Sequence, residues 1–407
     1  MSALTLTPRA LYEEVAEQLR QRIFRRELEP GSWIDELKIA EEFGIAVEWV
    51  YGSISLALLA GGLISPYAGG LADRHGAARV LSIGSVAAAV SLVVCGLASN
   101  ASLFLAGLVL VELASAFVLY STAFALLAQT TESQAQRSIT YLTLIAGFAS
   151  TIFWPLTTWM LQGLNWQHVY FVFACMHVLV CLPLHLWLTR FARIAAQRTS
   201  EESATPTVGA RGASNFTFIL VVLGFSLAGF VSAATLFHIV PMLGLLGLGG
   251  SGVLVATLFG PAQVASRLIN MAFGKDLPAP TLAVISSMLM PAALMVLVLT
   301  APAIAGAIAF AIIFGLGSGL FSIVSGTLPL ALFGKSGFGK RLGWISLGRL
   351  GVSAVAPFAL SVALGAIGPK PSVWILAGAG LACVAVFGEI WRRAKVTATS
   401  ANLSQPA

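Results

Sequence analysis

The chain is dominated by apolar runs that are each long enough to cross a lipid bilayer. A bilayer core about 30 Å thick needs about 20 helical residues. Hydrophobic residues make up 57% of the 407 residues and charged residues only 10%, which is more apolar side chain than a soluble protein can bury. The sequence therefore predicts an all-α, polytopic membrane protein. About eleven runs have the required size, near 47–71, 79–98, 102–127, 138–161, 167–190, 217–243, 248–272, 279–300, 302–328, 343–367 and 371–391.

A hydrophilic segment, residues 193–216, divides these runs into two sets. Five predicted spans lie in residues 47–192 and six lie in residues 217–391. Residues 1–46 are a separate hydrophilic fragment, and residues 392–407 are a predicted tail. We therefore expect a helical bundle with about eleven transmembrane helices in two halves, joined by a central loop.

Lys and Arg gather on one side of the predicted bundle. When the turns are numbered alternately, the other side holds only Lys370. Because cytoplasmic loops retain positive charge, we expect the basic side and the C-terminus to face the cytoplasm, with the chain in a bacterial inner membrane. The residues on the basic side are Arg74, Arg79, Arg137, Arg190, Arg193, Arg198, Arg211, Arg267, Lys275, Lys335, Lys340, Arg341, Arg392, Arg393 and Lys395.

Motifs of several other chemistries are missing from the sequence. The four cysteines lie inside apolar runs, without the spacing of metal sites or disulfide frameworks. There is no glycine-rich phosphate loop ending in Gly-Lys-Ser/Thr and no His-Glu-X-X-His. We therefore expect no enzyme activity, no metal and no cofactor. An ATP-driven pump is therefore unsupported, and any transport would have to draw its energy from an ion gradient or from the gradient of the solute itself.

The turn between the first two runs carries a family resemblance. Residues 69–79 read Gly-Gly-Leu-Ala-Asp-Arg-His-Gly-Ala-Ala-Arg. This segment resembles the signature loop of the major facilitator superfamily, and Ala77 departs from it where a basic residue is common. Residues 148–156, 259–267 and 315–329 are also similar to segments of this superfamily's bacterial members. The matching positions of the loop are Gly69, Asp73, Arg74, Gly76 and Arg79.

The resemblance implies a secondary transporter that moves a small organic solute by alternating access around a midplane site. It also implies a latch at the signature loop. Glycines permit a tight turn and close helix approach, while the carboxylate can pair with cations or cap a neighbouring helix. The family has twelve spans and its signature loop follows the second of them. Here the loop follows the first, so one span is missing.

The hydrophilic fragment takes the place of that missing span. Leu11, Val15, Leu19 and Ile23 form an apolar stripe on a charged helix. Residues 8–45 resemble the start of a GntR-type winged-helix domain, but the recognition helix that should follow is absent. Residues 1–45 hold six Lys or Arg against nine Asp or Glu, which argues against DNA binding. An unrelated amphipathic helix, a membrane-tethered regulator and a non-functional chimera remain alternatives.

Two charged residues are the first candidates for the transport site. Glu112 lies about ten residues into its run, close to the membrane midplane. A carboxylate there should face a wet cavity, pair with a cation or hold a proton, so it is a candidate for proton coupling or solute binding, with a packing role as the alternative. Arg349 lies about six residues inside its run, where it could snorkel, pair between the halves or meet an anionic solute.

Uncharged side chains complete the candidate set. His177 lies near the middle of its run and could join a proton relay, while His238 lies near the outer face and could line an entrance. Tyr120, Tyr141 and Trp154 could line the cavity and select flat or apolar solutes. Hydrogen bonding to neighbouring helices, packing and interfacial anchoring are the alternatives. The expected partners are the solute, a proton or another coupling ion, and the lipid bilayer; the oligomeric state is left open.

Overall fold

The fold is a bundle of helices. The computed structural model describes residues 47–131, 134–202, 214–249, 251–274 and 276–403, and in these residues every regular element is helical. Nine helical segments of this part are long and apolar enough to cross a membrane. The all-α, polytopic fold class is therefore confirmed. The predicted GntR-like fragment lies outside the described residues.

The predicted run count agrees with the nine segments once two broken helices are added. Run 138–161 is interrupted at Phe148, and run 248–272 is interrupted at Leu258. Each piece is shorter than a bilayer-spanning helix. Length and hydropathy alone place these runs in the bilayer but do not predict where they break.

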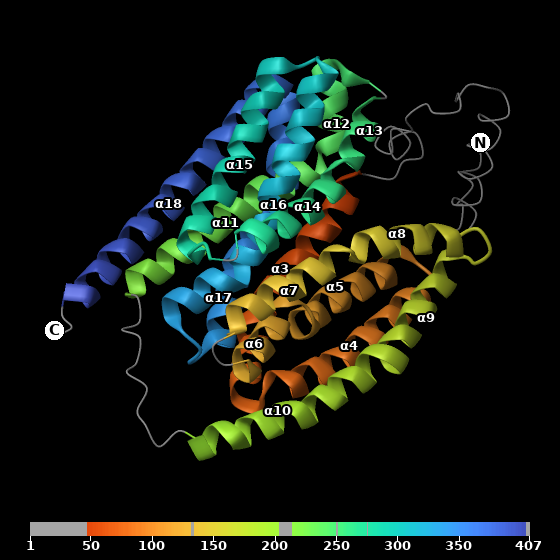
Figure 1. The fold of residues 1–407 in the computed structure, drawn as a ribbon. Coiled ribbons are helices and arrows are strands. Elements are labelled where there is room, and N and C mark those ends of the chain that lie inside the picture. Colours follow the sequence, from red (N-terminus) through yellow and green to blue (C-terminus); the bar gives the residue numbers. More distant parts are fainter. Residues whose placement is uncertain (1–46, 132–133, 203–213, 250, 275, 404–407) are drawn as a thin grey trace.

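The elements before residue 203 form what we call the first half, and those after residue 213 form the second half; Figure 1 shows them on two sides of the molecule. The first half contains α3 (Val47–His75), α4 (Ala77–Gly96), α5 (Ala101–Val118), α6 (Tyr120–Thr130), α7 (Ala135–Gly147), α8 (Ala149–Met160), α9 (Trp166–Met176), the π-helix η2 (His177–Cys181) and α10 (Leu182–Glu202). The second half contains α11 (Asn215–Phe237), α12 (Ile239–Leu243), the π-helix η3 (Gly244–Leu248), α13 (Ser251–Thr257), α14 (Phe259–Phe273), α15 (Ala279–Thr300), α16 (Ile304–Phe333), α17 (Phe338–Ile367) and α18 (Pro369–Leu403).

Two helices extend beyond their predicted spans. Helix α10 continues into the expected central loop as far as Glu202, and α18 continues through the expected tail as far as Leu403. Both extensions are hydrophilic, because the apolar run that predicts a span ends where the hydrocarbon core ends, whereas helical hydrogen bonding can continue into water.

Polar side chains fix the starts of several helices. Asn100 accepts a hydrogen bond from the backbone N–H of Leu103 at the start of α5, and Asn165 does the same for His168 in α9. An Asn or Ser at this position satisfies an N–H that has no partner within the helix. These residues therefore mark the starts of helices within an otherwise apolar sequence.

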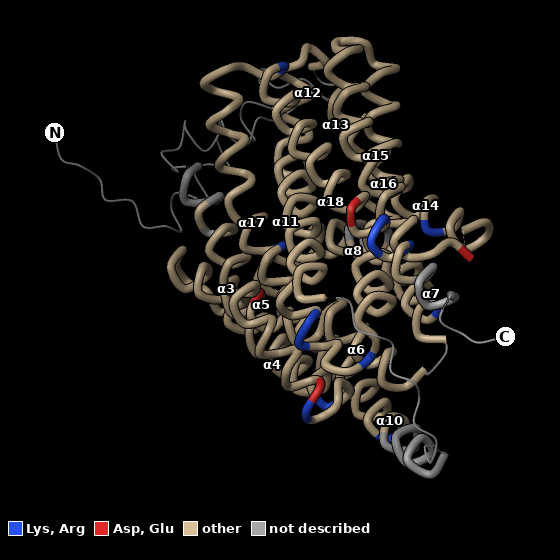
Figure 2. The backbone as a smooth tube through the Cα atoms, turned by 90° about the vertical axis from the view of Figure 1, so that its left-hand side faces the viewer, with Lys and Arg blue, Asp and Glu red and all other residues tan. Residues whose placement is uncertain are grey.

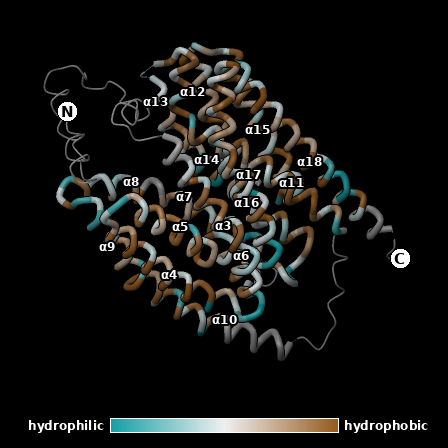
Figure 3. Tube along the Cα trace, turned by 180° about the vertical axis from the view of Figure 1, so that it is seen from behind, coloured by the Kyte–Doolittle hydropathy of each residue, from teal (hydrophilic) through white to brown (hydrophobic). Residues whose placement is uncertain are grey.

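The charged residues lie mainly at one end of the bundle, which we call the basic end. It contains the turn after α3, the starts of α7 and α17 and the ends of α10, α14 and α18. Figure 2 shows Lys and Arg gathered over this part of the molecule. Figure 3 shows hydrophobic residues along the helices and most hydrophilic segments near helix ends. This is the distribution that a bilayer requires.

The two halves meet along two sets of helices. Helix α3 packs antiparallel to α17, and α7 packs against α14 and α16. Most of the buried apolar core lies in the second half, around Phe225, Phe310 and Phe314. A smaller core lies at the basic end and includes side chains of both halves. The two halves therefore share a packed core at the basic end.

Candidate functional site

Asp73 of the signature loop joins the two halves at the basic end. Its Oδ1 accepts a hydrogen bond from the backbone N–H of Gly339 at 2.9 Å, and its Oδ2 accepts one from that of Lys340 at 2.8 Å. Helix α17 begins after Gly337, which has no side chain to cap these groups. A carboxylate of the first half therefore caps a helix of the second half, where the positive end of the helix dipole favours a negative charge.

The cap requires α3 and α17 to approach at backbone distance. A Cβ atom at Gly69 would overlap the carbonyl of Gly339, and a Cβ at Gly339 would lie 2.6 Å from the carbonyl oxygen of Gly69. One turn further along α17, a Cβ at Gly343 would lie 2.5 Å from the Cα of Pro66. Only glycine fits these positions. Gly69, which matches the family signature, thus lies at the point where α3 and α17 cross.

An apolar seal lies next to the Asp73 cap. Phe124 of α6 and Ile139 of α7 are buried, as are Leu330, Phe338 and Leu342 of the second half, and all five belong to one core. A Cβ at Gly326 of α16 would contact Phe124 and Ile139 at 2.7 and 2.8 Å. The cap and this seal, together called the basic-end closure, hold the two halves in contact at this end.

Arg267 provides a second connection between the halves, which the sequence did not reveal. Its side chain is only 6% exposed. Its Nη1 donates to the backbone carbonyl of Thr143 in α7 at 3.0 Å, and its Nε donates to that of Gly319 in α16 at 3.4 Å. The sequence feature that could have indicated this role is the position of Arg267 within an apolar run rather than in a turn, because an arginine inside a membrane span needs hydrogen-bond acceptors.

Gln129 holds the signature turn and was also missed. Its Nε2 donates to the carbonyl of Ala72, and its Oε1 accepts from the N–H of Ala77, both at 3.0 Å. Gly76, between α3 and α4, has φ +87°, a conformation that favours glycine. These contacts fix the direction in which α3 presents Asp73 to α17.

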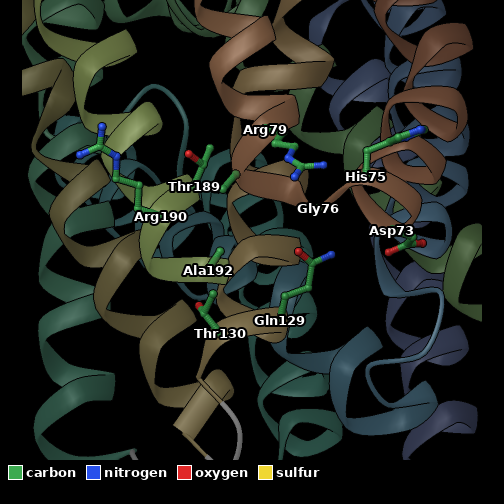
Figure 4. A pocket seen from close by; sticks show the side chains of 10 residues that line it. Asp73, His75, Gly76, Arg79, Gln129, Thr130, Thr189, Arg190 and Ala192 are labelled. Carbon is green, nitrogen blue, oxygen red and sulfur yellow. The ribbon is translucent and has the colours of Figure 1, made fainter. Parts of the chain in front are cut away.

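A cleft of about 740 Å³ lies beside the closure, not between the halves. Asp73, His75, Arg79, Gln129 and Arg190 are among its lining residues, and all of the lining comes from the first half. Figure 4 shows Asp73 at one edge and Arg190 at the other. Arg74 and Arg79 are exposed. The cleft therefore belongs to the outer surface of the basic end rather than to a passage through the bundle.

Glu112 and Arg349 lie deep in the bundle, one on each half. Each is eleven residues from the start of its helix, a rise of about 16 Å. A Cβ at Gly61 of α3 would lie 3.5 Å from Cγ of Glu112, while the adjacent Gly62 faces the backbone of α17 beside Arg349. The two charges therefore flank α3 at one level. They are not within ion-pair distance of each other.

The two candidate tyrosines occupy different environments. Tyr120 begins α6 and stacks on Phe124 at a centroid distance of 5.3 Å, and Phe124 belongs to the core that both halves share. Tyr141 accepts a hydrogen bond from Nε of Arg137 at 2.8 Å on the surface of α7. The structure thus places Tyr120, but not Tyr141, beside the core that both halves share.

The histidines lie away from the charged pair. His177 begins η2, which packs against α4 within the first half. His238 is buried at the junction of α11 and α12, where its Nδ1 lies 3.3 Å from the carbonyl oxygen of Ala234. The side chain of Trp154 is outside the described part. Within that part, no cluster of three His, Cys, Asp or Glu side chains could hold a metal ion.

Comparison with known families agrees with this arrangement. The model of the Major Facilitator Superfamily matches residues 33–326. The chain belongs to the major facilitator superfamily. The match begins inside the segment that resembles a GntR-type fragment, and that second resemblance finds no support. No curated protein sequence matches the chain significantly.

Solved transporters of the major facilitator superfamily share the fold. The human organic anion transporter MFSD10 (TETRAN) aligns with a TM-score of 0.66 and 14% identity over 93% of this chain and 90% of its own. The proton:xylose symporter XylE bound to 6-bromo-6-deoxy-D-glucose gives 0.63 and 13%, covering 88% and 87%. The transporter FucP in the outward conformation gives 0.58 and 14%, covering 84% and 89%. At these identities the likeness concerns the fold.

Removing the Asp73 cap is expected to open the basic end. The change Asp73→Ala deletes two charge-assisted hydrogen bonds, which at a helix N-terminus contribute about 1–2 kcal/mol, or about five- to thirtyfold in an equilibrium. We expect a cysteine at Ser346, introduced after replacing the native cysteines, to react that much more readily with an impermeant thiol reagent added at the basic end. Asp276→Asn, an exposed carboxylate of the α14–α15 turn, is the control. Equal labelling in both variants would exclude the cap as a latch.

Proposed function

We propose that this protein is a secondary transporter that moves a small organic solute by alternating access and couples the movement to protons. The observation that carries the proposal is the Asp73 cap, which joins the two halves at the basic end through a carboxylate and two backbone N–H groups. Such contacts can break and re-form as the halves rock, without covalent change. The cap, the seal and the Gly69 crossing would form together when the basic end closes.

Coupling is assigned to Glu112. A carboxylate deep in the bilayer is costly when ionised, and protonation removes that cost. Glu112 lies on the first half, and Arg349 faces the same level from the second. We therefore propose that Glu112 takes up a proton when it is accessible from one side and releases it when it is accessible from the other. The proton:xylose and fucose:proton symporters share this fold and favour the same class of mechanism.

The orientation follows from the charges. We propose that the basic end and the C-terminus face the cytoplasm of a bacterial cell, because Lys and Arg are retained on that side. The closure then shuts the cytoplasmic side, so the structure corresponds to an outward-facing or occluded state. Residues 8–45, proposed to be a GntR-like fragment, lack a recognition helix, and we assign them no DNA-binding role.

Uptake by purified protein in liposomes tests this function. The probes are two matched trios that differ in charge: glucose, glucuronate and glucosamine, and benzyl alcohol, benzoate and benzylamine. We expect an inward proton gradient to drive protein-dependent accumulation of at least one probe, and a protonophore to abolish it. Empty liposomes correct for passive entry. If no probe accumulates above the empty liposomes, the proposed function is contradicted.

A further inference from the structure

The charges between the two halves are unequal. Arg267 and Arg349 carry two positive charges, whereas Glu112 carries one negative charge. Arg267 bridges α14, α7 and α16, Arg349 packs against Gly229 of α11, and Glu112 packs against Gly61 of α3. The interior of this part of the bundle therefore has a net positive charge of one when Glu112 is ionised, and of two when it is protonated.

Arg349 differs from Arg267 in its partners. Arg267 is buried and donates to two carbonyl groups. Arg349 is partly exposed, and within the described part of the chain its guanidinium has no hydrogen-bond acceptor and no ion-pair partner. An arginine deep in a membrane protein normally pairs or meets carbonyl oxygens. Five N–H donors thus remain available at this level of the bundle.

The surroundings of Arg349 place the stem of its side chain beside the boundary between the halves. A Cβ at Gly229 would lie 2.7 Å from Cγ of Arg349 and 2.8 Å from Oγ of Ser353, so α11 fixes the stem of the side chain. One turn before it, Ser346 meets Ser121 of the first half, with 3.0 Å between the hydroxyl oxygens. The face of α17 that bears Arg349 therefore lies along the boundary between the halves and is lined by hydroxyl groups.

We infer that the transported solute is an organic anion, whose carboxylate binds Arg349 while Glu112, across the boundary, is protonated. The planar guanidinium fork matches a carboxylate and forms two parallel hydrogen bonds with it. An ionised Glu112 repels the anion, and a protonated Glu112 does not, so the proton and the anion bind together. One proton and one monoanion would cross as an electroneutral pair. This inference rests on the proposed function.

Because linkage is reciprocal, the proton dependence gives the inference a specific signature. Protonation of Glu112 should strengthen anion binding, so the affinity for the anion should fall as pH rises. A glutamine at position 112 mimics the protonated acid and should make the affinity independent of pH. A purely structural role of Arg349 predicts neither effect, because it gives Glu112 no influence on the ligand.

Calorimetric titration of the purified protein with the same two trios tests the inference. We expect glucuronate or benzoate to bind, with neutral and cationic members of its trio at least about tenfold weaker. Arg349→Gln should weaken carboxylate binding about ten- to hundredfold, and Arg349→Lys should restore part of it. The control is Arg341→Gln on the same helix, whose guanidinium donates to the carbonyls of Phe333 and Ser336; it should bind like the wild type.

Glu112→Gln provides a second readout that does not depend on the folding of an Arg349 variant. In this variant the affinity for the carboxylate ligand should not depend on pH, whereas the affinity of the wild type should rise as the pH falls. Binding of a neutral or cationic probe at equal strength, unchanged binding in Arg349→Gln, or no carboxylate binding at all would overturn the inference. Proton-driven uptake of a neutral probe would overturn the inference but would leave the proposed transporter function intact. Binding that depends on Arg349 without any uptake would contradict the proposed transporter function but would support the anion site.

Discussion

Gly69→Val is expected to reduce transport at least about tenfold. At Gly69 a side chain would meet the backbone carbonyl of Gly339, and backbone atoms cannot rotate away as a flexible side chain can. Overpacking typically costs about 1–3 kcal/mol, and here relief requires α3 and α17 to separate, which also breaks both Asp73 hydrogen bonds. We therefore expect proton-coupled uptake to fall at least about tenfold.

The neighbouring residue supplies a matched control for this prediction. A Cβ at Gly70 would meet no atom within 4 Å, although the two glycines share a helix and their sequence context. Gly70→Val should therefore keep most of the transport activity. The measurement is the rate of luminal pH change in liposomes, normalised to the amount of monodisperse protein that is inserted. Comparable loss in both variants would show that the close crossing of α3 and α17 is not what limits activity.

Glu112→Gln is expected to eliminate proton-driven accumulation. In a one-proton symport, a gradient of one pH unit can support about tenfold accumulation of solute, because each pH unit corresponds to about 1.4 kcal/mol. Glutamine has no titratable proton, so the variant should equilibrate its solute without concentrating it. Exchange of labelled for unlabelled solute should persist, since it requires movement of the halves but no proton release.

Glu389 is the control for the coupling carboxylate. It lies on α18, where it is paired with Arg392 and Arg393 at 2.7 Å each, rather than between the halves. Glu389→Gln should keep the dependence on the proton gradient. The experiment compares accumulation ratios at equal and unequal pH across the liposome membrane. A tenfold accumulation that survives in Glu112→Gln would remove this residue from the coupling mechanism.

Run length and composition were sufficient to predict the membrane fold. An apolar run of about 20 residues has few alternatives to a transmembrane helix, and each predicted run corresponds to one helix or a broken one. The breaks at Phe148 and Leu258 were not predicted, because proline within an apolar run does not always break a helix, as Pro291 of α15 and Pro357 of α17 show. Gly147 adjoins the first break, and Pro261 follows the second and cannot donate to the carbonyl of Thr257.

The site was predictable only in part, because hydropathy gives depth but not rotation about a helix axis. Tyr141 and Tyr120 both lie in apolar runs, yet Tyr141 lies on the surface with Arg137, whereas Tyr120 stacks on Phe124 of the core that both halves share. The partners of Asp73 are separated from it by 266 and 267 residues. No local sequence pattern indicates a contact between residues so far apart in the chain. The resemblance predicted that the carboxylate of Asp73 can cap a neighbouring helix, and the structure identifies that helix as α17.

The most direct test of the account is a pair of distances measured by pulsed electron resonance between spin labels. One pair lies at the basic end, at Arg190 and Phe273, and the other lies at the opposite end, at Leu164 and Ile304; all four side chains are exposed. Relative to the wild type, Asp73→Ala should lengthen the basic-end distance and shorten the opposite one. If both distances stay unchanged, or if both move in the same direction, the two halves do not alternate about the Asp73 closure.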